Sequence, residues 1–282
     1  MDNQPQPQSV QSSDGYNIDC RVWLPTNDTP TVAACLFVHG GAFTHGDCES
    51  HQAVSQSLVS SCSMAVVTCS FRNGGVAPHA TGKTMDDLSA VIRFVREKWS
   101  KNVPVGVVGS SSGGYFALAL VRHIGAELST QHHANDAQSL DFCIPICPVA
   151  NPGKRAKYLS SCINGTAEED GYAFYQTNKD VATSIQSAQL SFWEKMENAH
   201  EAGNALDIPS SVPTLMIIGA CDTNVPPQVT SGVQSWATRT ISIGGRGHEI
   251  CNAPPIGSCS WIPDVKRFVH GIAEERRESS RM

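Results

Sequence analysis

The feature that most constrains this sequence is the stretch VVGSSSGGYF at residues 107–116, where three serines stand between glycines. The preceding VPVGVVG is a short apolar run of the kind that forms a buried parallel strand. The following GYFALALVRHIG has apolar residues at helical spacing and predicts a helix that ends at Gly125. A flexible linker would not be flanked by a buried strand and an apolar helix. The serines are therefore predicted to lie in a tight strand–turn–helix connection.

The glycines around this turn select one serine. A turn this sharp needs residues without side chains two positions before and two positions after its apex. Ser111 lies between Gly109 and Gly113, whereas Ser110 and Ser112 lack a glycine at one or both of these positions. We therefore predict that Ser111 is a nucleophile in a G-x-S-x-G turn.

The rest of the chain alternates apolar runs with amphipathic stretches. Strands are predicted for YNIDCRVWLP, TVAACLFVHGG, MAVVTCSFR, LDFCIPICPV, VPTLMIIGACD and the shorter TRTISIGG. Helices are predicted for TMDDLSAVIRFVREKW and for SWIPDVKRFVHGIAEERRE. This alternation predicts an α/β fold, with a mostly parallel central sheet and helices on both of its faces.

One segment departs from the alternation. Between Val149 and Pro209 no strand pattern is present, and EDGYAFYQ and SIQSAQLSFWEKMENAH have helical patterns. Because about sixty residues is too long for a plain loop, we predict a helical cap inserted at about 150–208. The polar, proline-rich residues 1–14 are expected to be a disordered tail. Residues 15–282 are expected to form a single domain that carries the cap.

Composition excludes several classes of protein. The formal charge is −6 and lysine and arginine are scattered, so nucleic acid is not expected as a partner. No apolar run approaches the roughly 18 residues of a membrane span, and no signal peptide is recognisable, so an intracellular protein is expected. The eleven cysteines are irregularly spaced without a CxxC pair, which favours reduced, buried thiols. No metal-ligand spacing or phosphate loop is present, so neither a metal nor a cofactor is expected, and the oligomeric state is left open.

The tripeptide Ser280-Arg281-Met282 resembles the C-terminal SKL peroxisomal address. Its small, basic and large apolar residues follow the pattern of that address. A peroxisomal import receptor is therefore a candidate partner. The alternative is an ordinary polar tail on a cytoplasmic protein.

A serine hydroxyl is a weak nucleophile and needs a base. In sites built on such a turn, an acid and then a histidine follow later in the chain. Asp222 comes directly after a predicted buried strand, where ligand-facing groups of parallel sheets lie, although it could instead only cap the turn before Pro226. His248 follows 26 residues later on a glycine-rich loop. The adjacent Glu249 cannot orient that imidazole, so we predict Asp222 as the acid that acts with His248 and Ser111.

Backbone N–H groups are needed to stabilise the negative oxygen of the reacting group. The N–H of Ser112, directly after the nucleophile, is one expected donor. Gly40 and Gly41 in LFVHGGAF are the others, because glycines let the backbone approach a substrate closely. His39 is expected to brace this loop rather than to react.

These motifs resemble the α/β-hydrolase superfamily, and within it the carboxylesterases of the hormone-sensitive-lipase and kynurenine-formamidase type. The segment CSFRNGG…MDDLSAVIRFV is also similar to that family's segment before the nucleophile turn. Ala42 stands where the hormone-sensitive-lipase type usually has a third glycine, and Phe43 stands where formamidases have tryptophan. The resemblance therefore leaves the subfamily, and with it the substrate, open.

The favoured function is hydrolysis of a carboxylic ester of a small or aromatic substrate through an acyl-enzyme. Hydrolysis of an arylformamide or amide, and acyl transfer or cyclisation of a specialised metabolite, use the same triad. A ligand-binding protein without turnover would keep the same fold.

Four aromatic residues are expected to line an apolar, ring-tolerant pocket beneath the cap: Phe43, Tyr172, Phe192 and Trp193. For the residues in the cap, packing within the cap itself is an equally good interpretation.

Overall fold

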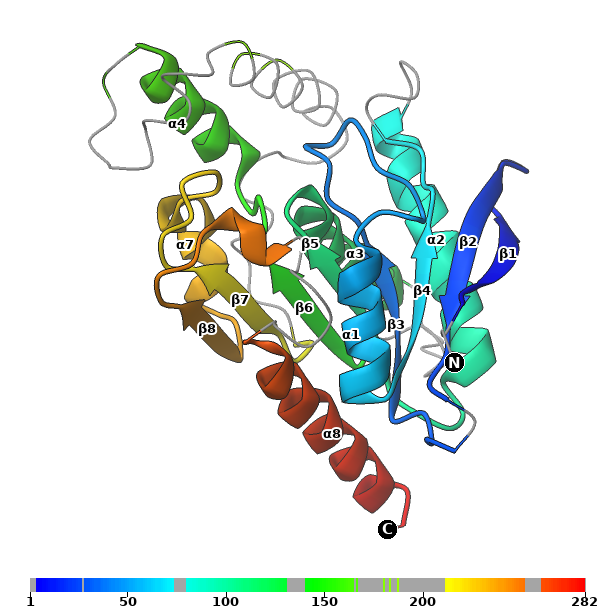
Figure 1. The fold of residues 1–282 in the computed structure, drawn as a ribbon. Helices are drawn as coiled ribbons and strands as arrows, with labels where there is room; N and C mark the ends of the chain where they lie inside the picture. Colours follow the sequence, from blue (N-terminus) through cyan, green and yellow to red (C-terminus); the bar gives the residue numbers. More distant parts are fainter. Residues whose placement is uncertain are drawn as a thin grey trace.

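The computed structural model describes residues 4–26, 28–73, 80–130, 140–164, 211–251 and 260–281, with residues 166, 180, 183 and 187. The described strands form one eight-stranded sheet in the order β1-β2-β4-β3-β5-β6-β7-β8 (Figure 1). They are β1 (Gln6–Gln11), β2 (Asn17–Trp23), β3 (Ala33–Val38), β4 (Met64–Cys69), β5 (Val105–Ser110), β6 (Phe142–Ile146), β7 (Leu215–Gly219) and β8 (Arg239–Ile243). Strands β3 to β8 run parallel, and only β1–β2 and β2–β4 pair antiparallel. The predicted α/β fold with a mostly parallel sheet is confirmed.

Strand β3 shows why the sheet is covered on both faces. All six of its residues are buried, and successive side chains of a strand point to opposite faces. Leu36 and Val38 contribute to one hydrophobic cluster, whereas Cys35 and Phe37 contribute to a second. A strand that is apolar on both sides needs helices on both sides.

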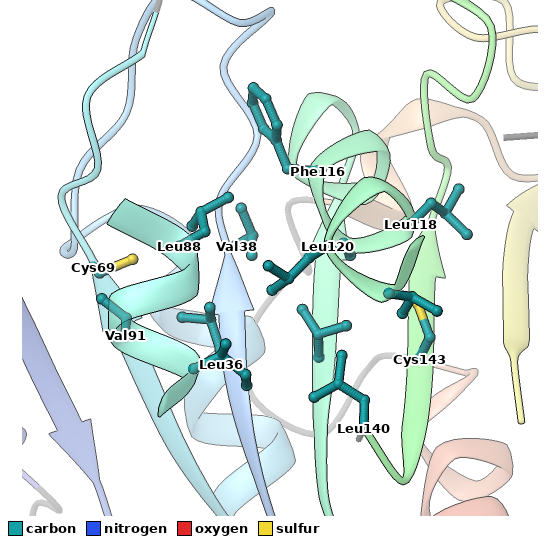
Figure 2. Close-up of a cluster of buried hydrophobic side chains, with 14 of the residues drawn as sticks. Leu36, Val38, Cys69, Leu88, Val91, Phe116, Leu118, Leu120, Leu140 and Cys143 are labelled. Carbon is teal, nitrogen blue, oxygen red and sulfur yellow. The ribbon is translucent and has the colours of Figure 1, made fainter. Parts of the chain in front are cut away.

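Two pairs of helices supply this cover. Leu88 and Val91 of α2 (Ala80–Trp99) and Leu120 of α3 (Ser112–Thr130) lie against Leu36 of β3 on one face (Figure 2). Helices α1 (Gln52–Cys62) and α8 (Ile262–Ser279) contact each other and cover the other face (Figure 1). The remaining named elements are α4 (Pro152–Asn164), α7 (Pro227–Gln234) and the short 3₁₀ helix η2 (His248–Cys251).

Helix α3 continues to Thr130, so the prediction that it ends at Gly125 is wrong. A glycine inside a helix costs about 1 kcal/mol relative to alanine. The apolar residues of α3 that pack into the core before this position outweigh such a cost.

The prediction of a disordered tail through residue 14 is also wrong, because Gln6–Gln11 forms β1 and pairs along its length with β2. Its side chains are exposed except for that of Val10. The strand therefore has almost no apolar pattern from which it could be recognised. Pro7, which lacks an N–H, is tolerated because β1 lies at the edge of the sheet.

The pairing between β6 and β7 has a gap. The N–H groups of Cys143 and Cys147 donate to the carbonyls of Pro213 and Ile217, at 2.9 and 2.7 Å. In a parallel strand, every second residue donates its N–H to the same neighbouring strand. Pro145 lies midway between Cys143 and Cys147 and should be the next donor to β7, but proline has no N–H to donate. Strands β6 and β7 are thus joined by a ladder that lacks one donor.

Helix α4 lies at the start of the segment 150–208, for which a helical cap was predicted; most of that segment lies outside the described residues, so the cap stays a prediction. The three aromatic residues predicted for the pocket in this segment, Tyr172, Phe192 and Trp193, lie outside the described residues. Ten of the eleven cysteines are described; they are free thiols, and all except Cys221 are buried. In the part of the chain that is described, no helix is long and apolar enough to cross a bilayer.

Candidate active site

Ser111 lies at the turn between β5 and α3, in the left-handed region with φ of 55°. Gly109 and Gly113, on either side of this turn, must be glycines because there is no room for a side chain at either position. A Cβ atom on Gly109 would lie 2.2 Å from the carbonyl oxygen of Gly113, and one on Gly113 would lie 2.1 Å from that of Val38. Both distances are far below any real contact of a Cβ atom. The structure thus gives a steric reason for the pattern that selected Ser111.

The backbone of Ser111 is fixed by the end of β6. Its N–H donates to the carbonyl of Ile146 at 2.8 Å. Its own carbonyl accepts the N–H groups of Gly114 and Val149, at 3.0 and 3.1 Å. These bonds hold the turn in place, so the strained serine cannot relax into an ordinary helix start.

The side chains of Ser111, His248 and Asp222 form a continuous relay. His248 Nε2 lies 3.0 Å from Ser111 Oγ, and His248 Nδ1 lies 2.8 Å from Asp222 Oδ2. A carboxylate only accepts hydrogen bonds, so Nδ1 carries a proton; in the neutral form of the ring, Nε2 then presents its lone pair to the serine hydroxyl. In this arrangement the imidazole can remove the hydroxyl proton as the serine attacks.

Asp222 is buried, and both oxygens of its carboxylate accept hydrogen bonds. Its second oxygen, Oδ1, accepts the backbone N–H groups of Asn224 and Val225 at 2.9 and 2.7 Å. Burial disfavours the charged form of His248, but the bond to Asp222 and the Cys147 thiol outweigh this effect and raise the pKa of His248 to about 9. The carboxylate therefore both orients the imidazole and stabilises its protonated form.

Glu249, the rival acid, faces elsewhere. Its Oε2 accepts the N–H of Gly247 at 2.8 Å, and Oε1 lies 3.6 Å from Arg246 Nε. Its side chain is exposed. The structure thus brings Asp222, and not Glu249, to His248.

The loop at residues 39–46 lies on the other side of Ser111. A Cβ atom on Gly40 would lie 3.1 Å from Ser111 Cβ. Gly41 has φ of 135°, and a Cβ atom on it would lie 1.9 Å from the carbonyl oxygen of His45. His39 Nδ1 donates to the carbonyl of Gly40 at 2.7 Å, and burial lowers the pKa of His39 to about 4. His39 is thus a neutral ring that holds the loop.

Gly40 differs from the prediction. Its N–H donates to His51 Nε2 at 3.2 Å and so does not point to a reacting oxygen. Within the described residues, the N–H of Gly41 has no backbone acceptor. Gly41 and Ser112 therefore remain as candidate donors from the predicted set. The signal for His51 was absent from the sequence, because nothing in its neighbourhood marks a contact with Gly40.

A cavity of about 400 Å³ opens onto this relay. Its lining is mostly glycine and polar side chains: Gly40, Gly41, Ala42, His45, Gly46, Ser50, His51, Ser111, Val149, Arg155, Asn224 and His248. Phe43 is not among them. Its ring is buried in edge contacts with Tyr115 and Phe116 at 5.6 and 5.5 Å. Phe43 therefore packs in the core and does not line the cavity, because left-handed φ angles at residues 42 and 43 turn the loop at this point.

Helix α4 is docked on the turn that carries Asp222. The hydroxyl of Tyr158 donates to the carbonyl of Thr223 at 2.7 Å. The buried guanidinium of Arg155 donates to the side-chain oxygen of Asn224, whose N–H in turn binds Asp222. The first helix of the expected cap thus supports the acid and brings a cation to the cavity wall, which sequence reasoning did not predict.

The described residues bring together one group with the chemistry of metal ligands. Cys147, His248 and Cys251 place their ligand atoms within 4.8 Å of one another. The two nitrogens of His248 are already used by Ser111 and Asp222. The neighbouring Cys251 thiol and burial together raise the pKa of the Cys147 thiol, which disfavours the thiolate that a metal would need. The group therefore fits the surroundings of the His248 imidazole better than a metal centre.

The chain belongs to the α/β-hydrolase fold family, whose sequence model matches residues 35–228. This match begins within β3 and includes the turn at Ser111 and Asp222.

Relatives with known names are esterases. An ethyl acetate hydrolase of Pseudomonas putida is 23% identical over 231 residues, which cover 76% of this chain and 64% of that protein. The esterase LipU of Mycobacterium tuberculosis is 27% identical over 126 residues, covering 45% of this chain and 40% of that protein. The chain thus spans less than two thirds of the length of these relatives.

Solved structures share the fold. Brefeldin A esterase, described as a bacterial homologue of human hormone-sensitive lipase, has a TM-score of 0.71 at 17% identity, covering 97% of this chain and 78% of that one. An esterase of Pyrobaculum calidifontis has a TM-score of 0.69 at 17% identity, covering 96% and 84%.

Proposed function

We propose that this chain is a serine esterase that hydrolyses small carboxylic esters through an acyl-enzyme. Ser111 Oγ attacks the ester carbonyl while His248 Nε2 takes the hydroxyl proton. The C–O bond to the alcohol then breaks, and His248 returns the proton to the departing oxygen. Water then gives a proton to His248 and attacks the acyl carbon. The bond to Ser111 Oγ breaks, His248 returns the proton to Oγ, and the carboxylic acid leaves.

The observation that carries this proposal is the relay from Asp222 through His248 to Ser111, with links of 2.8 and 3.0 Å. A nucleophile and base within hydrogen-bond reach, with the base oriented by a third group, is the arrangement that activates a serine. The N–H groups of Gly41 and Ser112 would stabilise the oxyanion.

The size and polarity of the cavity support a small substrate. About 400 Å³ accommodates a short acyl group and a small alcohol. The name of one relative, ethyl acetate hydrolase, also supports a short ester. We therefore propose short-chain or small aromatic esters rather than long-chain lipids.

The nucleophile is tested by comparing two adjacent serines. Ser111→Ala should lower kcat by about 10⁵-fold or more and abolish labelling by a fluorophosphonate. Ser112→Ala, the matched control, should keep most of the activity, because its proposed contribution is a backbone N–H. Peptide mapping of the adduct to Ser110 or Ser112 would refute the assignment of Ser111.

The reaction class is tested with two substrate series on the same enzyme. Initial rates on p-nitrophenyl esters of increasing chain length should fall as the acyl group lengthens. Faster turnover of arylformamides would favour the amide alternative. Fluorophosphonate labelling without turnover in either series would leave acyl transfer or cyclisation, and the absence of both would indicate a ligand-binding protein.

The peroxisomal address at Ser280-Arg281-Met282 stays a prediction. Ser280 and Arg281 are exposed at the end of α8, and Met282 lies outside the described residues. An import receptor would need an accessible tripeptide, and the two described residues meet this condition.

A further inference from the structure

His51 stands directly before α1 and has a left-handed φ of 59°. Its half-buried ring lines the cavity and makes no capping hydrogen bond to its own helix. Instead, both ring nitrogens reach backbone groups of other segments. Nε2 lies 3.2 Å from the N–H nitrogen of Gly40, and Nδ1 lies 3.1 Å from the carbonyl oxygen of Cys251.

These two partners define the protonation state of the ring. A carbonyl oxygen only accepts, so Nδ1 must carry a proton, and an N–H only donates, so Nε2 must be bare. A single neutral tautomer satisfies both contacts. Burial lowers the pKa of His51, and the nearby His248 lowers it as well, which agrees with a neutral ring.

The two contacts join two parts of the active site that are far apart in the sequence. Gly40 belongs to the 39–46 loop beside Ser111. Cys251 ends the 3₁₀ helix η2, which begins at His248. One imidazole therefore ties the backbone beside the nucleophile to the segment that carries the base.

His39 and His51 hold the two peptide groups on either side of the Gly40 Cα atom. His39 binds the carbonyl of Gly40, and His51 binds the N–H of the same residue. Because a trans peptide is planar and its C=O and N–H point in opposite directions, holding the Gly40 carbonyl also sets the direction of the Gly41 N–H. With both peptides of Gly40 held, the candidate oxyanion donor of Gly41 has little freedom to rotate.

We propose that His51 is a positioning residue that holds the Gly41 oxyanion donor in register with His248. The proposal rests on the esterase function proposed above. An oxyanion donor acts only when it lies about 2.7–3.1 Å from the developing negative oxygen. A misplacement of about 1 Å costs on the order of a hundredfold in rate. A clamp on the backbone of this loop is therefore a direct means of controlling the rate.

The first test removes both ring nitrogens but keeps an aromatic ring. His51→Phe should lower kcat about 10- to 100-fold and change KM by less than about threefold. His51→Gln, whose amide has both a donor and an acceptor, should recover most of the loss. If His51→Phe does not fold, as judged by its thermal melt, His51→Ala should be assayed with added imidazole, which should restore activity, whereas N-methylimidazole, which cannot donate, should not.

The second test uses a readout that a merely structural role would not change. The serine attacks a trifluoromethyl ketone to form a tetrahedral oxyanion. The matching methyl ketone forms much less of this adduct, so its Ki reports binding without the oxyanion. In His51→Phe the Ki of the trifluoromethyl ketone should rise by the same factor as kcat/KM falls, while the Ki of the methyl ketone stays unchanged.

The control is the next residue, Gln52, whose exposed side chain bonds Glu49. Gln52→Phe should leave kcat, KM and both Ki values within about twofold of the wild type. Failure of the two proposals can be distinguished. If wild-type Ser111 takes no fluorophosphonate, the esterase proposal fails. If the wild type is labelled and active but His51→Phe keeps its kcat and its trifluoromethyl ketone Ki, only the positioning role is wrong.

Discussion

Two glycine-rich turns face each other at the cavity, and different forces hold them. The turn at Ser111 is held by steric exclusion, because side chains on Gly109 or Gly113 would overlap backbone carbonyls. The 39–46 loop also leaves no room for a side chain at Gly41, where a Cβ atom would lie 1.9 Å from the carbonyl oxygen of His45, but it is held in addition by polar contacts from two imidazoles, those of His39 and His51. The need for glycines can be read from the sequence around Ser111, whereas the contact of His51 with Gly40 depends on the fold. We therefore expect the glycine positions to tolerate no change and the imidazole contacts to tolerate graded change.

The strongest test of this difference adds one carbon atom to the turn that carries Ser111. In Gly113→Ala the new Cβ would lie 2.1 Å from the carbonyl oxygen of Val38, and backbone cannot move aside as a side-chain end can. We expect the free energy of unfolding to fall by about 3 kcal/mol or more, with loss of fluorophosphonate labelling. Urea denaturation monitored by circular dichroism measures the first effect.

The matched control is Gly271→Ala on α8, where a Cβ atom would meet nothing within 4 Å. This change should raise stability by up to about 1 kcal/mol, because alanine favours a helix more than glycine does. Equal stability of the two variants would contradict the steric account of the turn.

A smaller effect is expected when Asp222 loses its charge. Asp222→Asn should lower kcat by about 10²- to 10⁴-fold. Against the effect of burial, the carboxylate, together with the Cys147 thiol, raises the pKa of His248 to about 9, so removal of the carboxylate charge should lower that pKa and move the acidic limb of the kcat/KM profile to lower pH. The pH dependence of kcat/KM for both enzymes checks the direction.

Glu249→Gln serves as the control for Asp222→Asn, since Glu249 is exposed and bonds Gly247 and Arg246. It should keep nearly the wild-type rate and pH profile. A large loss of kcat in this variant, with little loss in Asp222→Asn, would transfer the role of the acid to Glu249.

The smallest effect is expected in the loop held by polar contacts. Ala42 has φ of 52°, a left-handed conformation that costs a non-glycine residue about 1–2 kcal/mol. Ala42→Gly should relieve this cost, but glycine also loses more freedom on folding, by about 0.5–1 kcal/mol. The net change in stability should stay within about 1 kcal/mol, and kcat/KM within about threefold. A hundredfold loss of kcat/KM would mean that the side chain of Ala42, and not the histidine contacts, holds this loop.

The same contrast explains what could be predicted from the sequence. Strands β3 to β7 were recognisable because each is apolar and buried, and Ser111 was recognisable because its steric requirements fall on residues two positions away. Asp222 and His248 followed from chain order. Their convergence on Ser111 is a property of the structure alone.

The features that were missed have physical causes. Strand β1 is polar because an edge strand buries little, so it carried no pattern. The use of the Gly40 N–H by His51 depends on a contact in three dimensions that no local rule describes. The same holds for the contact of His51 with Cys251, 200 positions away in the sequence.

Because Pro145 donates no hydrogen bond, β6 and β7 are joined by one bond fewer, and the relay from Asp222 to Ser111 crosses this junction. Ser111 follows β5, on one side of the β6–β7 junction, and Asp222 follows β7, on the other. With one backbone bond fewer at that junction, the spacing between nucleophile and acid depends more on the interlocking of Ile144, Ile146 and Ile217 in the core beneath them. The geometry of this relay is thus partly a matter of volume. A methylene added or removed among these three isoleucines, none of which touches the cavity, would change the gap that His248 has to bridge.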